Sequence, residues 1–235
     1  MNSSQEVWAI IPTRGGSIGL PEKNIRILAG KPLLHYMLEA ATQARRLTRV
    51  VLTTDSDNIE REARIINGVE VRRHDPLLSA PGQPTFGTFR RTLEDLVRES
   101  GMEPMVVVML RVTTPLCLSS DIENTVGLLL ENRIGAISVL SVTKSDVHPK
   151  RTYVMDERCQ LTSREETPEK DYPLPRQVFD DVYIRNGAIY ATFPYVVQAG
   201  RLWGAKPLAY VMPKERSINI NDEVDFVLAE ALLRY

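Results

Sequence analysis

Cysteines and long apolar runs are both scarce in this sequence. Only Cys117 and Cys159 occur, and neither belongs to a CxxC pair or to a Cys/His cluster with metal-ligand spacing. We therefore expect reduced thiols, as is usual in a reducing compartment. No apolar run approaches the roughly eighteen residues of a membrane span, and no basic segment followed by an apolar one opens the chain. These absences predict a cytoplasmic protein with no membrane partner.

Net charge and aromatic content are low as well. The formal net charge is −1 and aromatic residues make up 6% of the chain, so the basic face and stacking positions of a nucleic-acid binder are missing. An apolar fraction of 43% and a charged fraction of 25% suit one globular domain spanning residues 1–235. We expect such a chain to bury a substantial core without disulfide bonds.

The two commonest phosphate-binding motifs are also absent, since no P-loop string and no Gly-x-Gly-x-x-Gly that opens a helix occurs. A different glycine-rich stretch, residues 10–24, begins at the end of the apolar run Val7–Ile11. Its small residues let backbone N–H groups approach phosphate oxygens, and Arg14 and Lys23 neutralise their charge. No regular apolar period appears from Pro12 to Lys31, so about twenty residues are predicted to be an irregular functional loop. A merely solvated basic loop is the alternative.

Apolar β-rich runs alternate with amphipathic segments along most of the chain. This alternation predicts an α/β fold with a doubly wound, mostly parallel sheet whose ligand lies beyond the carboxyl ends of the strands. Strands are expected at 7–11, 49–53, 69–72, 105–110 and 136–142, helices at 32–44, 58–66, 86–97, 119–132 and 223–233, and apolar order again at 184–191 and 208–212. Charged and proline-rich residues at 144–185 interrupt the pattern and predict an inserted arm, either a surface excursion or a contact to a second subunit.

Five segments together resemble a known family. The string IPTRGGSIGLPEKNIR at 11–26, followed by LAGKPL at 28–33, resembles the signature of the acylneuraminate cytidylyltransferases. TTD at 53–55, NGAIY at 186–190 and the segment 217–226 agree in order and spacing. The resemblance implies a Rossmann-like nucleotidyltransferase that transfers CMP from CTP to the anomeric hydroxyl of a 2-keto-3-deoxy sugar acid and releases pyrophosphate. Sialic, legionaminic and related nonulosonic acids are such substrates, and Mg²⁺ and a homodimer are implied as well.

The same resemblance assigns the site residues. Arg14 and Lys23 are expected to hold the triphosphate and to be catalytic. The residues expected at the nucleotide are Gly15, Gly16, Ser17, Asn24, Arg73 and Thr85. Those expected at the sugar acid are Arg111, Thr113, Arg151, Arg176, Asn186 and Tyr190, with Arg151 and Arg176 reaching across a dimer interface from the arm. Exposed surface positions for these two arginines and ordinary strand core for Tyr190 are the alternatives.

The sequence departs from the family pattern in three places. Arg111 stands where the family often has Gln, and its guanidinium fork suits a carboxylate, so a sugar acid other than ordinary sialic acid is expected. Ile18 replaces a frequent Lys. In the segment 217–222, SININD, the family offers two carboxylates to Mg²⁺, whereas here strand alternation puts the amides of Asn219 and Asn221 on one face. Amides bind Mg²⁺ poorly.

This last departure leaves alternatives open. Either Asp222 or Asp225 completes a metal site with Asn219 and Asn221, or the CTP phosphates and water hold the metal, or activity is weak or absent. Asp222 with Asp225 also has the spacing of a helix cap, as does Asp55 before the helix at 58–66. The functional alternatives to a working cytidylyltransferase are a nucleotide-binding, dimeric interaction protein and a sugar-1-phosphate nucleotidyltransferase that uses another base.

Overall fold

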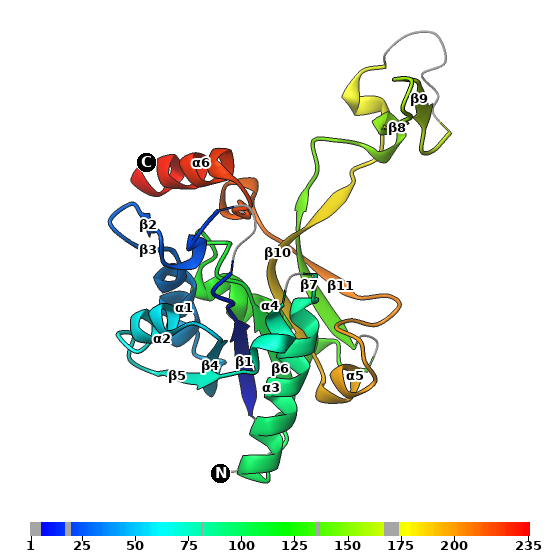
Figure 1. Ribbon diagram of the computed structural model, residues 1–235. Coiled ribbons are helices and arrows are strands. Elements are labelled where there is room, and N and C mark those ends of the chain that lie inside the picture. Colours follow the sequence, from blue (N-terminus) through cyan, green and yellow to red (C-terminus); the bar gives the residue numbers. More distant parts are fainter. Residues whose placement is uncertain (1–5, 17–19, 81, 135–136, 167–173) are drawn as a thin grey trace.

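The computed structural model describes residues 6–16, 20–80, 82–134, 137–166 and 174–235. A seven-stranded sheet in the order β11-β7-β10-β6-β1-β4-β5 forms the centre of the molecule (Figure 1). The strands are β1 Val7–Pro12, β4 Arg49–Thr54, β5 Val69–Arg73, β6 Val106–Leu110, β7 Ser138–Lys144, β10 Tyr183–Thr192 and β11 Leu208–Val211. Paired strands are parallel except where β10 meets β6 and β7. The predicted α/β fold with a mostly parallel sheet is confirmed.

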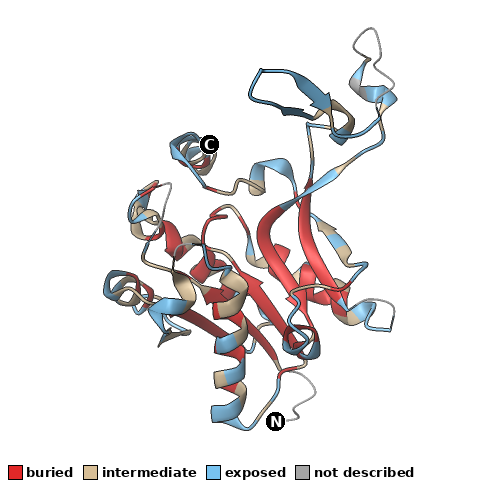
Figure 2. Cartoon of the chain, turned by 45° about the vertical axis from the view of Figure 1, so that its right-hand side comes forward, coloured by how far each residue is buried: buried red, intermediate tan, exposed pale blue. Residues whose placement is uncertain are grey.

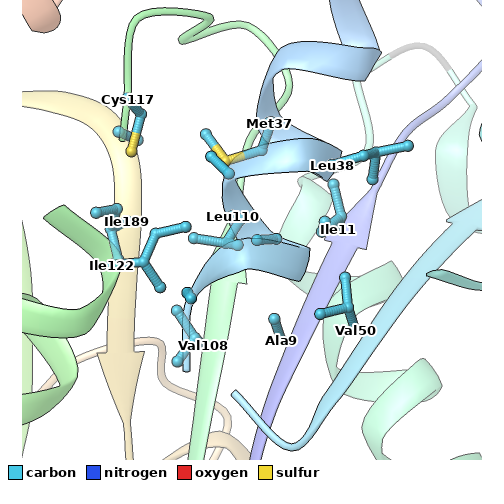
Figure 3. Packing of buried hydrophobic residues seen from close by; sticks show 14 of the residues in the cluster. Ala9, Ile11, Met37, Leu38, Val50, Val108, Leu110, Cys117, Ile122 and Ile189 are labelled. Atoms are coloured by element: carbon cyan, nitrogen blue, oxygen red, sulfur yellow. The ribbon is translucent and has the colours of Figure 1, made fainter. Parts of the chain in front are cut away.

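Helices cover both faces of this sheet, because successive side chains of a strand point to opposite faces. Ala9 and Ile11 of β1 belong to a core that includes residues of α1, α2 and α4, part of which Figure 3 shows. Trp8 and Ile10 belong to a second core with residues of α3 and α5. The helices are α1 Leu33–Gln43, α2 Asp57–Ala63, α3 Thr85–Ser100, α4 Ser119–Glu131, α5 Pro194–Gln198 and α6 Glu223–Arg234. None of these helices is both long and apolar enough to cross a bilayer.

The loop after β1 is more regular than predicted. Its second half forms the short 3-10 helix η2 Lys23–Ile25 and a small hairpin of β2 Ile27–Leu28 with β3 Lys31–Pro32. Leu28 is buried in a cluster that includes Phe226 of α6. The expectation of an irregular loop from Pro12 to Lys31 is therefore wrong for its second half, because the C-terminal helix supplies apolar contacts that the local sequence does not reveal.

Residues 144 and 183–185, which were predicted to be part of an inserted arm, pair within the sheet. Residues 145–166 and 174–182, between β7 and β10, project from the body as an arm (Figures 1 and 2). It contains η4 Pro149–Arg151, the two-stranded pair of β8 Tyr153–Met155 with β9 Leu161–Ser163, and η5 Arg176–Val178. The apolar side chains on the pair are mostly exposed, at 62% for Met155 and 63% for Leu161. The described part of the arm thus presents exposed apolar surface.

Candidate functional site

A cavity of about 150 Å³ lies at the carboxyl ends of β1, β5 and β6. This is where a doubly wound sheet is expected to bind its ligand. The loop after β1, the segment after β5 and the turn after β6 each contribute part of the wall. Seven predicted residues line this site cavity, namely Arg14, Gly16, Lys23, Asn24, Thr85, Arg111 and Thr113. Five further polar residues, Thr13, His74, Ser79, Gln83 and Thr88, line it as well.

Three cations meet in the site cavity. Within the described ranges, Arg14, Lys23 and Arg111 have no carboxylate within the 4.0 Å of an ion pair. Burial lowers the pKa of Lys23, and the positive charges of Arg111 and Arg14 lower it further, with Asp225 opposing them. The Lys23 ammonium donates a hydrogen bond to the Ile220 carbonyl at 2.8 Å, so it is held in place without being neutralised. Such a cluster has excess positive charge that an anion would satisfy.

Two buried acceptors also point to a ligand. The Asn24 amide nitrogen donates to the Arg14 carbonyl at 3.0 Å, whereas its Oδ1 is buried without a partner in the described part of the chain. The same holds for the Thr113 hydroxyl oxygen. A buried polar atom without a hydrogen bond is costly, so both atoms are suited to bind a donor group of a ligand.

The glycines of the loop divide their roles. The N–H of Gly15 donates to the Asp55 carboxylate at 2.7 Å and Gly15 does not line the site cavity, so its contact with the nucleotide stays a prediction. Gly16 lines the site cavity, and a side chain there would meet open space. Ser17 and Ile18 lie outside the described residues. The Asp55 carboxylate does not cap α2, since the neighbouring Ser56 takes the N-cap position.

The segment before α6 lies against the site cavity. The N–H of Ile220 donates to the Thr113 carbonyl at 2.8 Å, and the Ile220 carbonyl accepts from Lys23. The segment is not a strand, so the alternation expected for Asn219 and Asn221 is wrong. Its position follows instead from these backbone contacts and from the fully buried Ile220 side chain.

The residues predicted to hold Mg²⁺ have other partners. Asp222 caps α6 by accepting from the Asp225 N–H at 3.0 Å, and Asp225 accepts from the N–H groups of Asn221 and Asp222. Asn219 keeps a buried Oδ1 without a partner among the described residues. Those residues contain no group of three His, Cys, Asp or Glu side chains that could hold a metal ion. This donor set does not fit a magnesium site built on protein carboxylates, and Mg²⁺ stays a prediction.

Arg73 does not line the site cavity. Its guanidinium lies 3.0 Å from the carboxylate of Asp57 and 3.5 Å from that of Glu60. It borders a neighbouring pocket that shares His74 and Leu78 with the site cavity. A contact of Arg73 with the nucleotide stays a prediction.

Asn186 and Tyr190 lie on β10 and are both buried. The Asn186 Oδ1 accepts from the Ser141 hydroxyl at 2.6 Å, and its amide nitrogen donates to Ser217 at 3.0 Å. Tyr190 stacks on Trp203 with 6.0 Å between ring centroids. Neither residue lines the site cavity, so their contacts with a sugar acid stay predictions.

Arg151 and Arg176 lie on the arm. The Arg151 guanidinium donates to the Leu174 carbonyl and lies 4.9 Å from the ring centroid of Phe179, in a pocket at the base of the arm. The backbone of Arg176 begins η5. Arg151 does not line the site cavity of its own chain, and the role of the two arginines across a dimer interface stays a prediction.

Sequence reasoning missed His74, for which it found no partner. Its Nδ1 lies 2.9 Å from the Thr53 hydroxyl and its Nε2 lies 3.2 Å from the Ser79 hydroxyl. One signal was available: His74 directly follows a predicted strand, and the carboxyl ends of parallel strands are where ligands bind. Its partners lie on other loops, which a linear pattern does not bring together.

Known proteins resemble this chain in sequence and in fold. The sequence pattern of the cytidylyltransferase family matches residues 8–143. The chain is 30% identical over 225 residues to the N-acylneuraminate cytidylyltransferase of Escherichia coli and 27% identical over 226 residues to that of Oncorhynchus mykiss. These matches cover 95% and 96% of this chain but 51% and 50% of the relatives. The chain therefore spans about half the length of the curated relatives it matches.

Two solved structures resemble the fold over almost their whole length. One is a CMP:2-keto-3-deoxy-manno-octonic acid synthetase complexed with CTP, with a TM-score of 0.72 and 97% of this chain and 98% of that chain covered. The other is a 4-diphosphocytidyl-2C-methyl-D-erythritol synthase from Anaerococcus prevotii, with a TM-score of 0.66 and 99% and 97% covered. Both are 15% identical in sequence, so the likeness concerns the fold alone.

Proposed function

Because the chain belongs to the cytidylyltransferase family, we propose that it transfers CMP from CTP to the anomeric hydroxyl of a 2-keto-3-deoxy sugar acid and releases pyrophosphate. One observation carries the proposal: Arg14, Lys23 and Arg111 line one cavity without a carboxylate partner in the described part of the chain. A triphosphate and a sugar carboxylate bring the negative charge that such a cluster attracts.

The reaction makes specific demands on these residues. The anomeric oxygen bonds to the α-phosphorus, the bond from that phosphorus to the oxygen bridging to the β-phosphate breaks, and the hydroxyl proton is released. Since negative charge grows on the departing pyrophosphate, catalysis relies on positioning and on fixed positive charge. We propose that Lys23 and Arg14 supply this charge, with Lys23 already held by the Ile220 carbonyl before the substrate arrives.

The remaining cavity residues divide between the two substrates. We propose that Asn24, Gly16 and Thr85 contact the nucleotide, with the free Oδ1 of Asn24 as an acceptor. Arg111 and the free hydroxyl oxygen of Thr113 would then bind the sugar acid, because a guanidinium pairs with a carboxylate in a bidentate geometry. The two relatives are named N-acylneuraminate cytidylyltransferases, and we extend the proposal to keto sugar acids of this class.

Magnesium is expected to accompany CTP. We propose that the phosphates and water hold it, rather than Asn219, Asn221 and Asp222. Support comes from the capping contacts of Asp222 and from the absence, among the described residues, of a group of three His, Cys, Asp or Glu side chains that could hold a metal ion. Bound in this way, the ion would supply positive charge to the phosphates.

A second copy of the chain is expected to cover the arm. We propose a homodimer in which the arm of one copy packs on the other, because its apolar residues, such as Met155 and Leu161, are exposed in the single chain. In such a dimer, Arg151 and Arg176 would approach the partner's site cavity. If so, Met155→Lys should shift the protein to monomers in size-exclusion chromatography with light scattering. An unchanged mass would contradict this arrangement.

Pyrophosphate release tests the activity. Purified protein would be incubated with Mg²⁺, CTP and each of N-acetylneuraminic acid, legionaminic acid and 2-keto-3-deoxy-manno-octonic acid. Release that requires both a sugar acid and CTP, with UTP and GTP inactive, supports the proposal. Release with UTP or GTP and a sugar-1-phosphate would instead identify a different nucleotidyltransferase.

The segment before α6 favours a second candidate. Since it offers amides and a capping Asp222 to a metal, a nucleotide-binding, dimeric interaction protein without transfer activity is the alternative. Calorimetry separates the two functions: tight CTP binding with no turnover across the whole panel would favour the interaction protein and reject the enzyme.

A further inference from the structure

Asp55 joins three loops at the edge of the sheet. Its Oδ1 accepts a hydrogen bond from the N–H of Gly15 at 2.7 Å, and its Oδ2 accepts one from the Ser79 hydroxyl at 2.6 Å. Gly15 belongs to the loop after β1, Asp55 follows β4, and Ser79 ends the 3-10 helix η3 Pro76–Ser79 after β5. A carboxylate that does not itself line the site cavity therefore links two parts of its wall.

The Gly15 backbone packs closely against this carboxylate. A Cβ at position 15 would stand 2.8 Å from the Ser56 Cβ and 3.4 Å from the Asp55 Oδ1. The Ser56 Cβ is attached to the backbone and cannot swing aside, so only glycine fits here without moving the loop. Arg14 and Gly16, on either side of Gly15, line the site cavity. Their position consequently depends on the contact between Gly15 and Asp55.

His74 extends the same network. Because the Ser79 hydroxyl donates its hydrogen bond to Asp55, its oxygen is left to accept from the Nε2–H of His74. The Nδ1 of His74 then accepts from the Thr53 hydroxyl. Burial, opposed by the charge of Asp55, lowers the pKa of His74 and favours this neutral ring. Burial also opposes ionisation of Asp55, yet the hydrogen bonds from Ser79 and Gly15 outweigh it and lower the pKa of the carboxyl. An ionised Asp55 and a neutral His74 satisfy every bond in the network.

We propose that Asp55 is a positioning residue for the nucleotide, holding the loop of Arg14 and Gly16 and the wall at Ser79 at the spacing that a triphosphate requires. This inference rests on the proposed CTP site. A capping role does not account for Asp55, because the N-cap of α2 is Ser56, whose side chain accepts from the Ile59 N–H. Charge-assisted hydrogen bonds are among the stronger ones in proteins, which suits a carboxylate that fixes a loop.

Calorimetry with CTP and Mg²⁺ tests the proposal. Asp55→Ala removes both bonds and should weaken CTP binding about tenfold or more, the range expected when hydrogen bonds to a charged group are lost. Asp55→Asn keeps an oxygen for Gly15 but presents an amide to Ser79, so its dissociation constant should fall between those of the wild type and Asp55→Ala. The near-isosteric Asn variant also guards against a failure of the Ala variant to fold.

A matched control lies one residue away. Ser56→Ala removes the helix cap but keeps the Cβ beside Gly15, so it should lower the melting temperature and leave CTP affinity unchanged. Inorganic tripolyphosphate, titrated in parallel, should show the same Asp55 dependence as CTP, because the loop is proposed to hold phosphate.

Three outcomes have distinct meanings. Weaker CTP and tripolyphosphate binding in the Asp55 variants, at a melting temperature no lower than that of Ser56→Ala, supports the positioning role. Wild-type affinity in Asp55→Ala overturns the inference and leaves the proposed function intact. A wild-type chain that binds no CTP overturns both.

Discussion

The Lys23→Ala substitution tests the charge that we place at the centre of the reaction. The side chain is half-buried and lines the site cavity, and its ammonium donates to the Ile220 carbonyl at 2.8 Å. In the described part of the chain no carboxylate neutralises it within ion-pair distance. Its removal should therefore affect the bound triphosphate far more than the fold.

The size of the effect follows from simple electrostatics. A unit charge about 4 Å from another is worth roughly 4 kcal/mol at an effective dielectric constant of 20. Partial exposure reduces this value, and hydrogen bonds to charged groups contribute about 1.5–3 kcal/mol. We expect kcat/KM for CTP to fall roughly 30- to 150-fold, which corresponds to about 2–3 kcal/mol.

Stability should hardly change. The variant loses one hydrogen bond to Ile220, worth about 0.5–1.5 kcal/mol. It also relieves the repulsion that Arg111 and Arg14 exert on Lys23, which acts in the opposite direction. We expect the melting temperature to change by less than about 4 °C, the shift of roughly 1 kcal/mol in a chain of this size.

Steady-state pyrophosphate release and thermal unfolding would be measured side by side. Lys31→Ala is the control, because Lys31 carries the same charge on the same loop, pairs with Glu39 and does not line the site cavity. It should keep wild-type kcat/KM. Equal losses of activity in both variants would refute a local role for Lys23, and a large drop in melting temperature would show that Lys23 acts through folding instead.

Three further predictions concern other parts of the site. Arg111→Gln should raise KM for the sugar acid about tenfold with a smaller effect on KM for CTP, since one guanidinium–carboxylate pair is lost; equal effects on both constants would contradict the assignment. Because we place the metal with the phosphates, Asn221→Asp should leave Mn²⁺ binding to the nucleotide-free protein unchanged in electron paramagnetic resonance, and tighter binding would place the ion near Asn219. Burial lowers the pKa of His74, so as the pH falls the unfolded chain takes up this proton before the folded one does. The free energy of unfolding should therefore fall as pH drops below about 6.5, and it should fall less in His74→Asn. Identical pH dependence in urea titrations of both proteins would argue against the buried neutral ring.

Local pattern sufficed for most of the fold. Expected strands such as 49–53 and 69–72 agree with β4 and β5 within one residue. This agreement is possible because the spacing of apolar side chains that distinguishes a strand from a helix involves only residues close together in the sequence. The direction of β10 was not predicted. It runs antiparallel to β6 and β7, and it follows the arm, whose path the linear sequence does not define.

The candidate site shows a similar division. Arg14, Lys23, Asn24 and Thr113 line the same cavity, because the loop after β1 and the turn after β6 lie at one edge of the sheet, and their contacts with substrate stay predictions. The sequence did not indicate that the Gly15 N–H would donate to Asp55, forty residues away. The residue types at this edge of the sheet could be predicted from the sequence, but their hydrogen-bond partners could not.

By itself, the sequence determined the layered α/β architecture and the positive charge at the mouth of β1, because both follow from side chains close together in the chain. Only the tertiary structure decided how that charge is held. The contact from Lys23 to Ile220 joins residues 197 positions apart, and the one from Gly15 to Asp55 joins residues 40 apart. Such bonds need residues that only the folded chain brings together, so no local pattern encodes them.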